Sequence, residues 1–198
     1  MKKGIIAMAV ILMMTMCGCQ KDNHKEYSKI YENYGDIKNY SADIDVMVVS
    51  SDGETKYSAK QYYMAPDLYR LDYTSEDMQG ISCVLSGENL SFMDKEGNVT
   101  DFRGYVPNEK YYIFLNDFME RYCKSEDAKS SVEKGKTVLE VLGEEDDPNR
   151  AKMRLWVDNK SYIPIKLVTY NDKDEERVIV EFKNFKMNTK IDKKLFDV

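Results

Sequence analysis

The chain has 198 residues, with 29 Lys or Arg against 35 Asp or Glu, so its formal net charge is −6 at pH 7. That length suits one domain with a sizeable core. The negative balance disfavours nucleic acid or an anionic lipid surface as a partner, because both reward patches of Lys and Arg.

The N-terminal segment has the pattern of an export signal. Lys2 and Lys3 provide a positive start, and an uncharged, mostly aliphatic run follows from Gly4 to Met16. This run is too short for a permanent transmembrane helix, which needs about 20 residues. It leads into a cysteine preceded by glycine, which resembles the lipobox of bacterial lipoproteins.

Of the two cysteines at the end of this run, Cys19 is the better acceptor, since Gly18 precedes it whereas Met16 precedes Cys17. We expect residues 1–18 to be a lipoprotein signal peptide and residues 19–26 to be a lipidated tether. Cys19 would carry covalent diacylglycerol and an acyl chain such as palmitate, which together hold a protein stably at a membrane. An uncleaved anchor is the alternative. A metal or redox role would need further ligands, and none follow.

Processing would leave 180 residues with 27 basic and 35 acidic side chains, a formal net charge of −8. Two cysteines, Cys83 and Cys123, remain in the folded part, and both lie in apolar settings. They could pair in an exported protein. We favour two separate buried thiols over a disulfide.

A helix is expected first in the mature chain, followed by a run of strands. Apolar residues from Tyr27 to Ile37 recur at helical spacing over about three turns. The period then changes to alternation, and tight turns such as Asp52-Gly53 separate short segments. Consecutive strands joined in this way form an antiparallel meander. The six expected strands cover residues 42–48, 55–64, 68–74, 81–86, 90–94 and 99–103.

A second amphipathic helix is expected over residues 108–123, followed by a polar loop. Four more strands are expected over residues 137–142, 152–157, 165–170 and 178–185. One face of such a sheet must be buried, and the two helices are the elements available to cover it. We therefore predict a mainly β fold with α: a curved antiparallel sheet of about ten strands, a half-barrel, with two helices inside the curve, in a single domain over residues 27–198.

Three segments of the mature chain carry a known pattern. They are Tyr62 to Leu71 around Ala65-Pro66-Asp67, Leu155 to Asp158 with Ile163 to Leu167, and Phe185 to Phe196. In this order they resemble the LolA/LolB-like superfamily of lipoprotein carriers, and the resemblance covers essentially the whole mature chain. Among Gram-positive members, the GerS-like germination lipoproteins of clostridia are most similar in length, lipobox and composition.

This resemblance implies a protein without enzymatic activity in the spore envelope. Its implied role is to bind and activate a cell-wall N-acetylmuramoyl-L-alanine amidase of the CwlD type, which prepares cortex peptidoglycan for degradation. In Gram-negative carriers of the superfamily the inside of the curve receives acyl groups. A carrier of lipid or lipoprotein that uses the concave apolar face is therefore the alternative.

Nothing in the sequence predicts a catalytic or metal site. His24, the only histidine, lies on the tether, where no fixed nucleophile is within reach. The acidic run from Glu144 to Asp147 lacks the spacing and the glycine of a calcium loop, so an acidic turn is favoured. Asp43 and Asp45 share a strand face, which we interpret as a solvated edge.

Two sets of aromatic residues are candidates for binding. The helix stripe and one tryptophan either form the lid of the core or line an acyl cavity; these residues are Tyr111, Phe114, Leu115, Phe118, Tyr122 and Trp156. Five tyrosines on two neighbouring strands cannot all be buried on one face, and tyrosine favours protein contacts. This candidate partner surface comprises Tyr57, Tyr62, Tyr63, Tyr69 and Tyr73. An open sheet edge also permits a homodimer.

Overall fold

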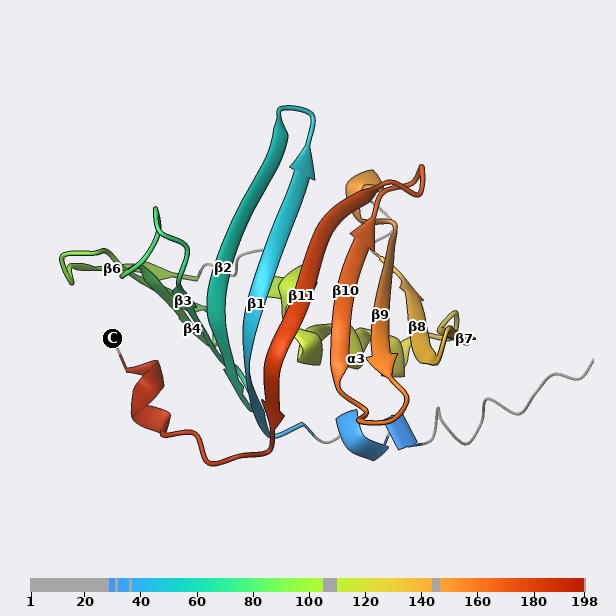
Figure 1. Cartoon of the computed structure of the whole chain (residues 1–198). Helices are drawn as coiled ribbons and strands as arrows, with labels where there is room; N and C mark the ends of the chain where they lie inside the picture. The colour runs from blue at the N-terminus through green and yellow to red at the C-terminus, as the bar shows by residue number, and fades with distance from the viewer. Residues whose placement is uncertain (1–28, 31, 36, 105–109, 144–146, 198) are drawn as a thin grey trace, which may run out of the picture.

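The computed structural model describes residues 29–30, 32–35, 37–104, 110–143 and 147–197. Its main feature is one antiparallel sheet of eleven strands (Figure 1). The first half of the chain supplies β1 (Asn39–Ser50), β2 (Gly53–Met64), β3 (Leu68–Tyr73), β4 (Ser82–Ser86), β5 (Asn89–Met93) and β6 (Val99–Arg103). The second half supplies β7 (Lys129–Glu133), β8 (Lys136–Leu142), β9 (Lys152–Asp158), β10 (Pro164–Tyr170) and β11 (Glu176–Met187).

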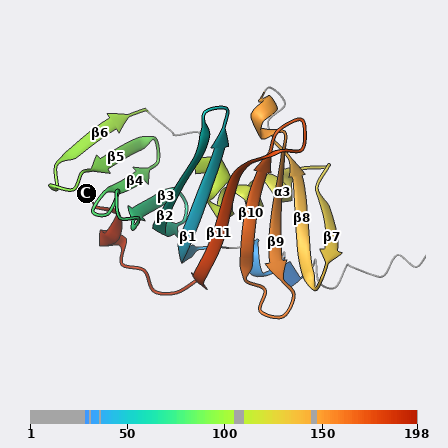
Figure 2. The same cartoon turned by 45° about the horizontal axis from the view of Figure 1, so that its top comes forward.

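The strand order explains where the helices lie. It runs β6-β5-β4-β3-β2-β1-β11-β10-β9-β8-β7, so β6 and β7, consecutive along the chain, form the two open edges. The segment between them must cross the whole sheet. It contains α2 (Lys110–Ile113) and α3 (Leu115–Lys124), which lie against one face (Figures 1 and 2). The predicted fold is confirmed: a curved, open antiparallel sheet with helices on its concave face.

One strand was not expected from the sequence. The segment predicted as a polar loop includes β7, which pairs with β8 over its full length. All five of its residues are exposed, and only Val132 is a large apolar residue. Alternation therefore leaves no signal in this strand. A short, charged edge strand of this kind discourages unwanted pairing.

The predicted helix over residues 108–123 is interrupted at Phe114, whose backbone is extended (φ −98°, ψ 130°). The interruption leaves a carbonyl and an amide without helical partners, and two strand residues satisfy them. Gln61 Nε2 donates to the carbonyl of Ile113 at 2.9 Å, and the Leu115 amide donates to Tyr40 Oη at 3.0 Å. Tyr40 in turn donates to Gln61 Oε1 at 3.0 Å. Since buried polar groups need partners, these two side chains fix the interruption in place.

The helix predicted near the N-terminus is present in the described residues 29–30 and 32–34. Ile30 and Tyr34 are buried against the core. The hydroxyl of Tyr34 donates to the carbonyl of Tyr162, in the turn between β9 and β10. This helix therefore packs against one end of the sheet. Tyr27 and Tyr31, predicted for its apolar face, lie outside the described residues.

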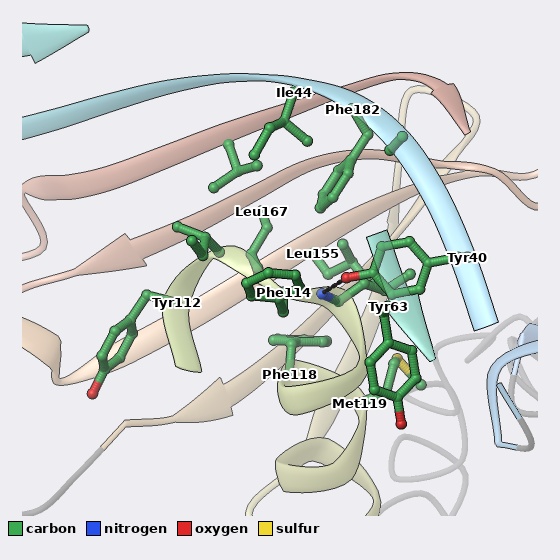
Figure 3. Packing of buried hydrophobic residues seen from close by; sticks show 14 of the residues in the cluster. Tyr40, Ile44, Tyr63, Tyr112, Phe114, Phe118, Met119, Leu155, Leu167 and Phe182 are labelled. Atoms are coloured by element: carbon green, nitrogen blue, oxygen red, sulfur yellow. Dashed lines mark hydrogen bonds between the residues drawn. The ribbon is translucent and has the colours of Figure 1, made fainter. Parts of the chain in front are cut away.

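The core lies between α3 and the concave face, as Figure 3 shows for 14 of its residues. Alternate strand residues such as Ile44, Leu155 and Leu167 point toward the helices and are at most 1% exposed. The convex face is covered in part by the chain end. There η3 (Lys193–Phe196) packs on β3 and β4, and Arg70 Nη1 donates to the Leu195 carbonyl at 2.6 Å.

Candidate functional site

The helices cover the concave face unevenly. Leu115, Phe118, Met119 and Tyr122 are at most 3% exposed and belong to the core cluster with β8 to β11. The connection must end at β7, so the longer helix, α3, covers this half of the sheet. Of the predicted lid residues, Leu115, Phe118 and Tyr122 are thus part of a filled core. The side chain of Tyr111 lies outside the described residues.

The other half of the concave face holds an apolar pocket of about 440 Å³. It lies over β2 to β5 beside α2, and most of its accessible surface is apolar. Phe114 is the predicted lid residue that lines it. The remaining lining residues include Tyr57, Tyr73, Cys83, Leu85 and Leu90.

Four of the five candidate partner tyrosines point into the concave face. Tyr63 on β2 lies directly opposite Tyr69 on β3. Tyr57 is an even number of residues from Tyr63, and Tyr73 is an even number from Tyr69, so all four side chains lie on the same face of the sheet. Tyr63 and Tyr69 are 6% and 4% exposed, so their assignment to a partner surface is wrong. Tyr57 and Tyr73 are half-buried in the pocket wall, with ring centroids 5.4 Å apart. Tyr62 alone faces the convex side.

Tyr69 positions α3 through its hydroxyl group. Tyr69 Oη donates to Asp117 Oδ1 at 3.1 Å and accepts from Asn116 Nδ2 at 3.0 Å. Its ring meets the ring of Phe114 edge-on, with centroids 4.9 Å apart. Burial raises the pKa of Tyr69 far above its ordinary value, so the phenol remains a neutral donor. These groups have a structural role, because they connect β3 to α3.

Trp156 was predicted to belong to the lid of the core or to line the concave cavity, and it does neither. Its neighbours Leu155 and Val157 are fully buried under the helices, so the alternate residue faces the convex side. Trp156 shares that side with Arg154 and Asp158, a signal that the sequence already contained.

Trp156 belongs to a second apolar cluster, on the convex face of β1, β11, β10 and β9. We call it the convex strip, and it comprises Met47, Val49, Trp156, Val168, Tyr170 and Ile179. Cationic groups lie over its rings: Lys166 Nζ is 5.8 Å from the Trp156 centroid, and the Arg154 guanidinium is 5.6 Å from the Tyr170 centroid. Met47, Val49 and Trp156 remain half-buried. An aromatic centre framed by charged side chains is typical of a protein interface.

Asp43 and Asp45 have structural partners on the convex face. Asp45 accepts from Ser58 Oγ at 2.6 Å and forms an ion pair with Lys183. The hydrogen bond from Lys183 lowers the pKa of Asp45. Asp43 accepts from Asn184 Nδ2 at 2.6 Å. Both carboxylates therefore link β1 to its neighbouring strands.

The two cysteines do not form a disulfide. Cys83 is half-buried in the pocket wall, but Cys123 is exposed, so the expectation of two buried thiols is wrong for Cys123. The inner stripe of α3 includes Met119 and Tyr122; one step further the helix turns Cys123 outward.

Several predicted features fall outside the described residues: Cys19, His24 and positions 144–146 of the acidic run. Asp147 is described, and its carboxylate accepts from the Asn149 amide at 2.9 Å at the start of η2 (Pro148–Arg150). In the described part of the chain, no three potential metal ligands gather at one place. None of its helices combines the length and apolar character needed to cross a bilayer.

Sequence comparison places the chain in a family. Residues 1–196 match the family described as sporulation protein YdcC-like. The chain belongs to the YdcC-like sporulation protein family. No protein of curated function matches it in sequence.

Solved structures share the fold of this YdcC-like chain. The GerS lipoprotein of Clostridioides difficile, solved in complex with the CwlD amidase, is 24% identical with a TM-score of 0.53, over 86% of this chain and 99% of GerS. An uncharacterized protein from Thermus thermophilus is 11% identical with a TM-score of 0.55, over 88% and 92% of the two chains. A LolA superfamily protein from Nitrosomonas europaea is 13% identical with a TM-score of 0.44, over 86% and 97%. The predicted resemblance to GerS-like proteins is confirmed at the level of the fold.

Proposed function

We propose that this chain is an exported lipoprotein of the spore envelope that binds and activates a cell-wall N-acetylmuramoyl-L-alanine amidase of the CwlD type. It is held at the membrane through Cys19 and catalyses no reaction itself. The observation that carries this proposal is the fold shared with GerS, a protein solved in complex with such an amidase, over nearly the whole length of both chains. Membership of a sporulation protein family supports the same setting.

The convex strip is the proposed amidase-binding surface. The concave half under α3 is filled, and in the other half two of the five candidate tyrosines, Tyr63 and Tyr69, are buried on β2 and β3. The strip instead presents a tryptophan and a methionine at the surface, and both residue types are enriched in interfaces. Lys152, Arg154 and Lys166 surround it, and each forms an ion pair with a carboxylate of this chain, so the rim of the strip is polar and carries both signs of charge.

Pairing of two copies through a sheet edge remains a proposal, and β7 suits it better than β6. In an antiparallel self-pairing centred on Ser131, Lys129 lies opposite Glu133 on both sides. A pairing of β6 about its centre would instead place two Asp101 carboxylates face to face.

Complex formation tests the proposed partner. The mature protein, extracted from membranes in detergent, is mixed with the amidase of the same organism, and the masses are measured by size-exclusion chromatography with light scattering. We expect one peak whose mass is the sum of the two proteins. This protein loaded alone under the same conditions shows, by its mass, whether two copies pair. Separate elution of the two proteins at micromolar concentration would contradict the proposal, because specific interfaces of standard size commonly bind at about 1 μM or tighter.

A lipid or lipoprotein carrier is the second candidate, favoured by the apolar pocket over β2 to β5. Its volume of about 440 Å³ lies within the usual range for small-molecule sites. An acyl chain placed there would contact Tyr57, Leu85 and Leu90 and would cover Cys83.

Thiol labelling distinguishes a carrier from a pure interaction module. Burial raises the pKa of both thiols, but Cys123 is exposed, so we expect a water-soluble disulfide reagent to modify Cys123 about tenfold faster than Cys83. Excess palmitate slows the reaction of Cys83 if the pocket takes an acyl chain, while Cys123 serves as the internal control. An unchanged Cys83 rate would contradict the carrier function.

A further inference from the structure

The two ends of the sheet differ in charge. One end, which we call the basal end, comprises the N-terminal helix (residues 29–30 and 32–34), the β7–β8 turn, the β9–β10 turn (residues 159–163) and residues 186–192 at and after the end of β11. The N-terminal helix, the β9–β10 turn and the end of β11 lie at the bottom of Figure 1. The Asn159 amide donates to the Gly135 carbonyl at 3.4 Å, which joins the β9–β10 turn to the β7–β8 turn. The Asn188 amide donates to the Asn39 carbonyl at 2.8 Å, which joins the end of β11 to the start of β1. The turns at the opposite end carry mainly carboxylates, including Asp52, Asp172, Asp174 and Glu175.

Lysines dominate the basal end, and none of those named here forms an ion pair with a described residue. They are Lys29, Lys134, Lys160, Lys186 and Lys190. Lys160 follows the end of β9, and Lys186 and Lys190 lie on either side of the end of β11. All five lysines are exposed.

Two carboxylates at this end accept hydrogen bonds from backbone amides. Asp158 Oδ1 accepts from the amides of Lys160 and Ser161 at 3.0 and 2.8 Å. Asp192 Oδ1 accepts from the Lys194 amide at 3.0 Å. Glu32, Asp67 and Glu133 are exposed there as well, which makes five carboxylates at this end; with Lys38 and Lys136, which are also exposed, the lysines number seven. The overall negative charge of the chain therefore conceals a local positive surface.

The β9–β10 turn adds an exposed apolar residue to this surface. Ile163 is 41% exposed and lies three residues after Lys160. Tyr34 holds the turn to the N-terminal helix through the Tyr162 carbonyl, and Lys29 Nζ lies 5.6 Å from the Tyr162 ring centroid. A lysine-flanked aliphatic residue on a fixed turn suits the boundary between lipid headgroups and acyl chains.

The length of the tether keeps this end close to a membrane. Lys29 lies ten residues after Cys19, and ten residues span at most about 35 Å when fully extended. Strands β1 and β2, with 12 residues each, extend about 40 Å away from it. The basal end is therefore the part of the described structure that the tether brings nearest to the bilayer.

We propose that the basal end docks on an anionic phospholipid surface, with the lysines at the headgroups and Ile163 inserted between them. This inference rests on the proposed membrane anchor. It reverses the expectation, drawn from net charge alone, that anionic lipid is disfavoured. The strands then stand upright on the membrane, the acidic turns point away from it, and the convex strip stays open to a partner.

Hydrogen exchange on vesicles tests this orientation. The full chain, produced with its own signal in a Gram-positive host and purified from membranes, is reconstituted in vesicles of phosphatidylcholine alone or with one third phosphatidylglycerol. We expect amide exchange in residues 159–163 to slow at least threefold on the anionic vesicles. Since each lysine near an anionic surface contributes roughly fivefold to the docked population, Lys29→Glu with Lys160→Glu removes the protection. Ile163→Ser reduces it.

Matched controls come from the opposite end. Lys173→Glu and Leu142→Ser change an exposed lysine and an exposed aliphatic residue there, and both are expected to leave the protection unchanged. Equal exchange on both vesicle types, or protection at residues 51–53 and 171–175, would overturn the docking proposal. The mass of the N-terminal peptide reports acylation of Cys19 separately. An uncleaved anchor precedes Lys29 as well, so the docking result stands whichever anchor is found.

Discussion

Replacing Phe118 by alanine is expected to lower the free energy of unfolding by about 3–5 kcal/mol. Phe118 is fully buried, and its ring stacks on Tyr122 with centroids 5.9 Å apart. It lies at the centre of the contact between α3 and the concave face (Figure 3). Its removal leaves a cavity that the sheet cannot close, because the strands are fixed by their hydrogen bonds. Urea denaturation followed by circular dichroism measures the change.

Phe102→Ala is the matched control for this prediction. Phe102 is on the edge strand β6 and is 48% exposed, so the same substitution removes little buried area. We expect a change within about 0.5 kcal/mol. An equal loss of stability in both variants would show that α3 is not the element that holds the core together.

Replacing Trp156 by alanine is expected to weaken amidase binding by about 2 kcal/mol, roughly thirtyfold in affinity, as for a central tryptophan of an interface. Trp156 is half-buried on the convex strip and lies outside the main core cluster, so the sheet remains folded. Calorimetric titration of the amidase with the two forms of the protein measures the difference, and circular dichroism verifies the fold.

Tyr62→Ala provides the comparison on the same face. Tyr62 is a half-buried aromatic residue on the convex side of β2, outside the strip, opposite Arg70. The Tyr62→Ala substitution is expected to change the affinity for the amidase by no more than about twofold, because most residues outside the centre of an interface have small effects. Loss of affinity in Tyr62→Ala with none in Trp156→Ala would move the partner surface to the other half of the sheet.

The strands with alternating burial were readable from the sequence because one face of the sheet is buried. In β1, Ala42, Ile44 and Val46 alternate with polar residues and face the core. The polar edge strand β7 has no buried face, so its residues carry no such pattern. This segment is a strand because it forms hydrogen bonds with β8, and the periodicity of its own residues does not predict those bonds.

The interruption of the second helix was not readable for a different reason. Its apolar stripe continues through Phe114 without change, and nothing local disfavours a helix there. The partners that stabilise the interruption are Tyr40 and Gln61, at least 50 residues earlier in the sequence. A buried glutamine in an otherwise apolar strand face was the available signal, because such a residue needs a hydrogen-bond partner.

The candidate site was predictable only as a list of aromatic residues. Alternation along β9 places Trp156 on the same face of the sheet as Arg154 and Asp158. Alternation along β2 places Tyr62 on the opposite face from Tyr57 and Tyr63. Which of the two faces is covered by the helices depends on the side of the sheet along which the segment between β6 and β7 runs. The apolar pocket and the uneven distribution of lysines likewise arise from segments that are distant in sequence.

Release of peptides from purified cortex peptidoglycan is the measurement that tests the central claim most directly. Three reactions are compared: the amidase alone, the amidase with this protein, and this protein alone. If the protein acts by binding, amide cleavage rises about tenfold or more when both are present, a coupling of about 1.4 kcal/mol or greater, and this protein alone releases nothing. Cleavage by this protein alone, or an amidase rate that its addition leaves unchanged, would contradict the account.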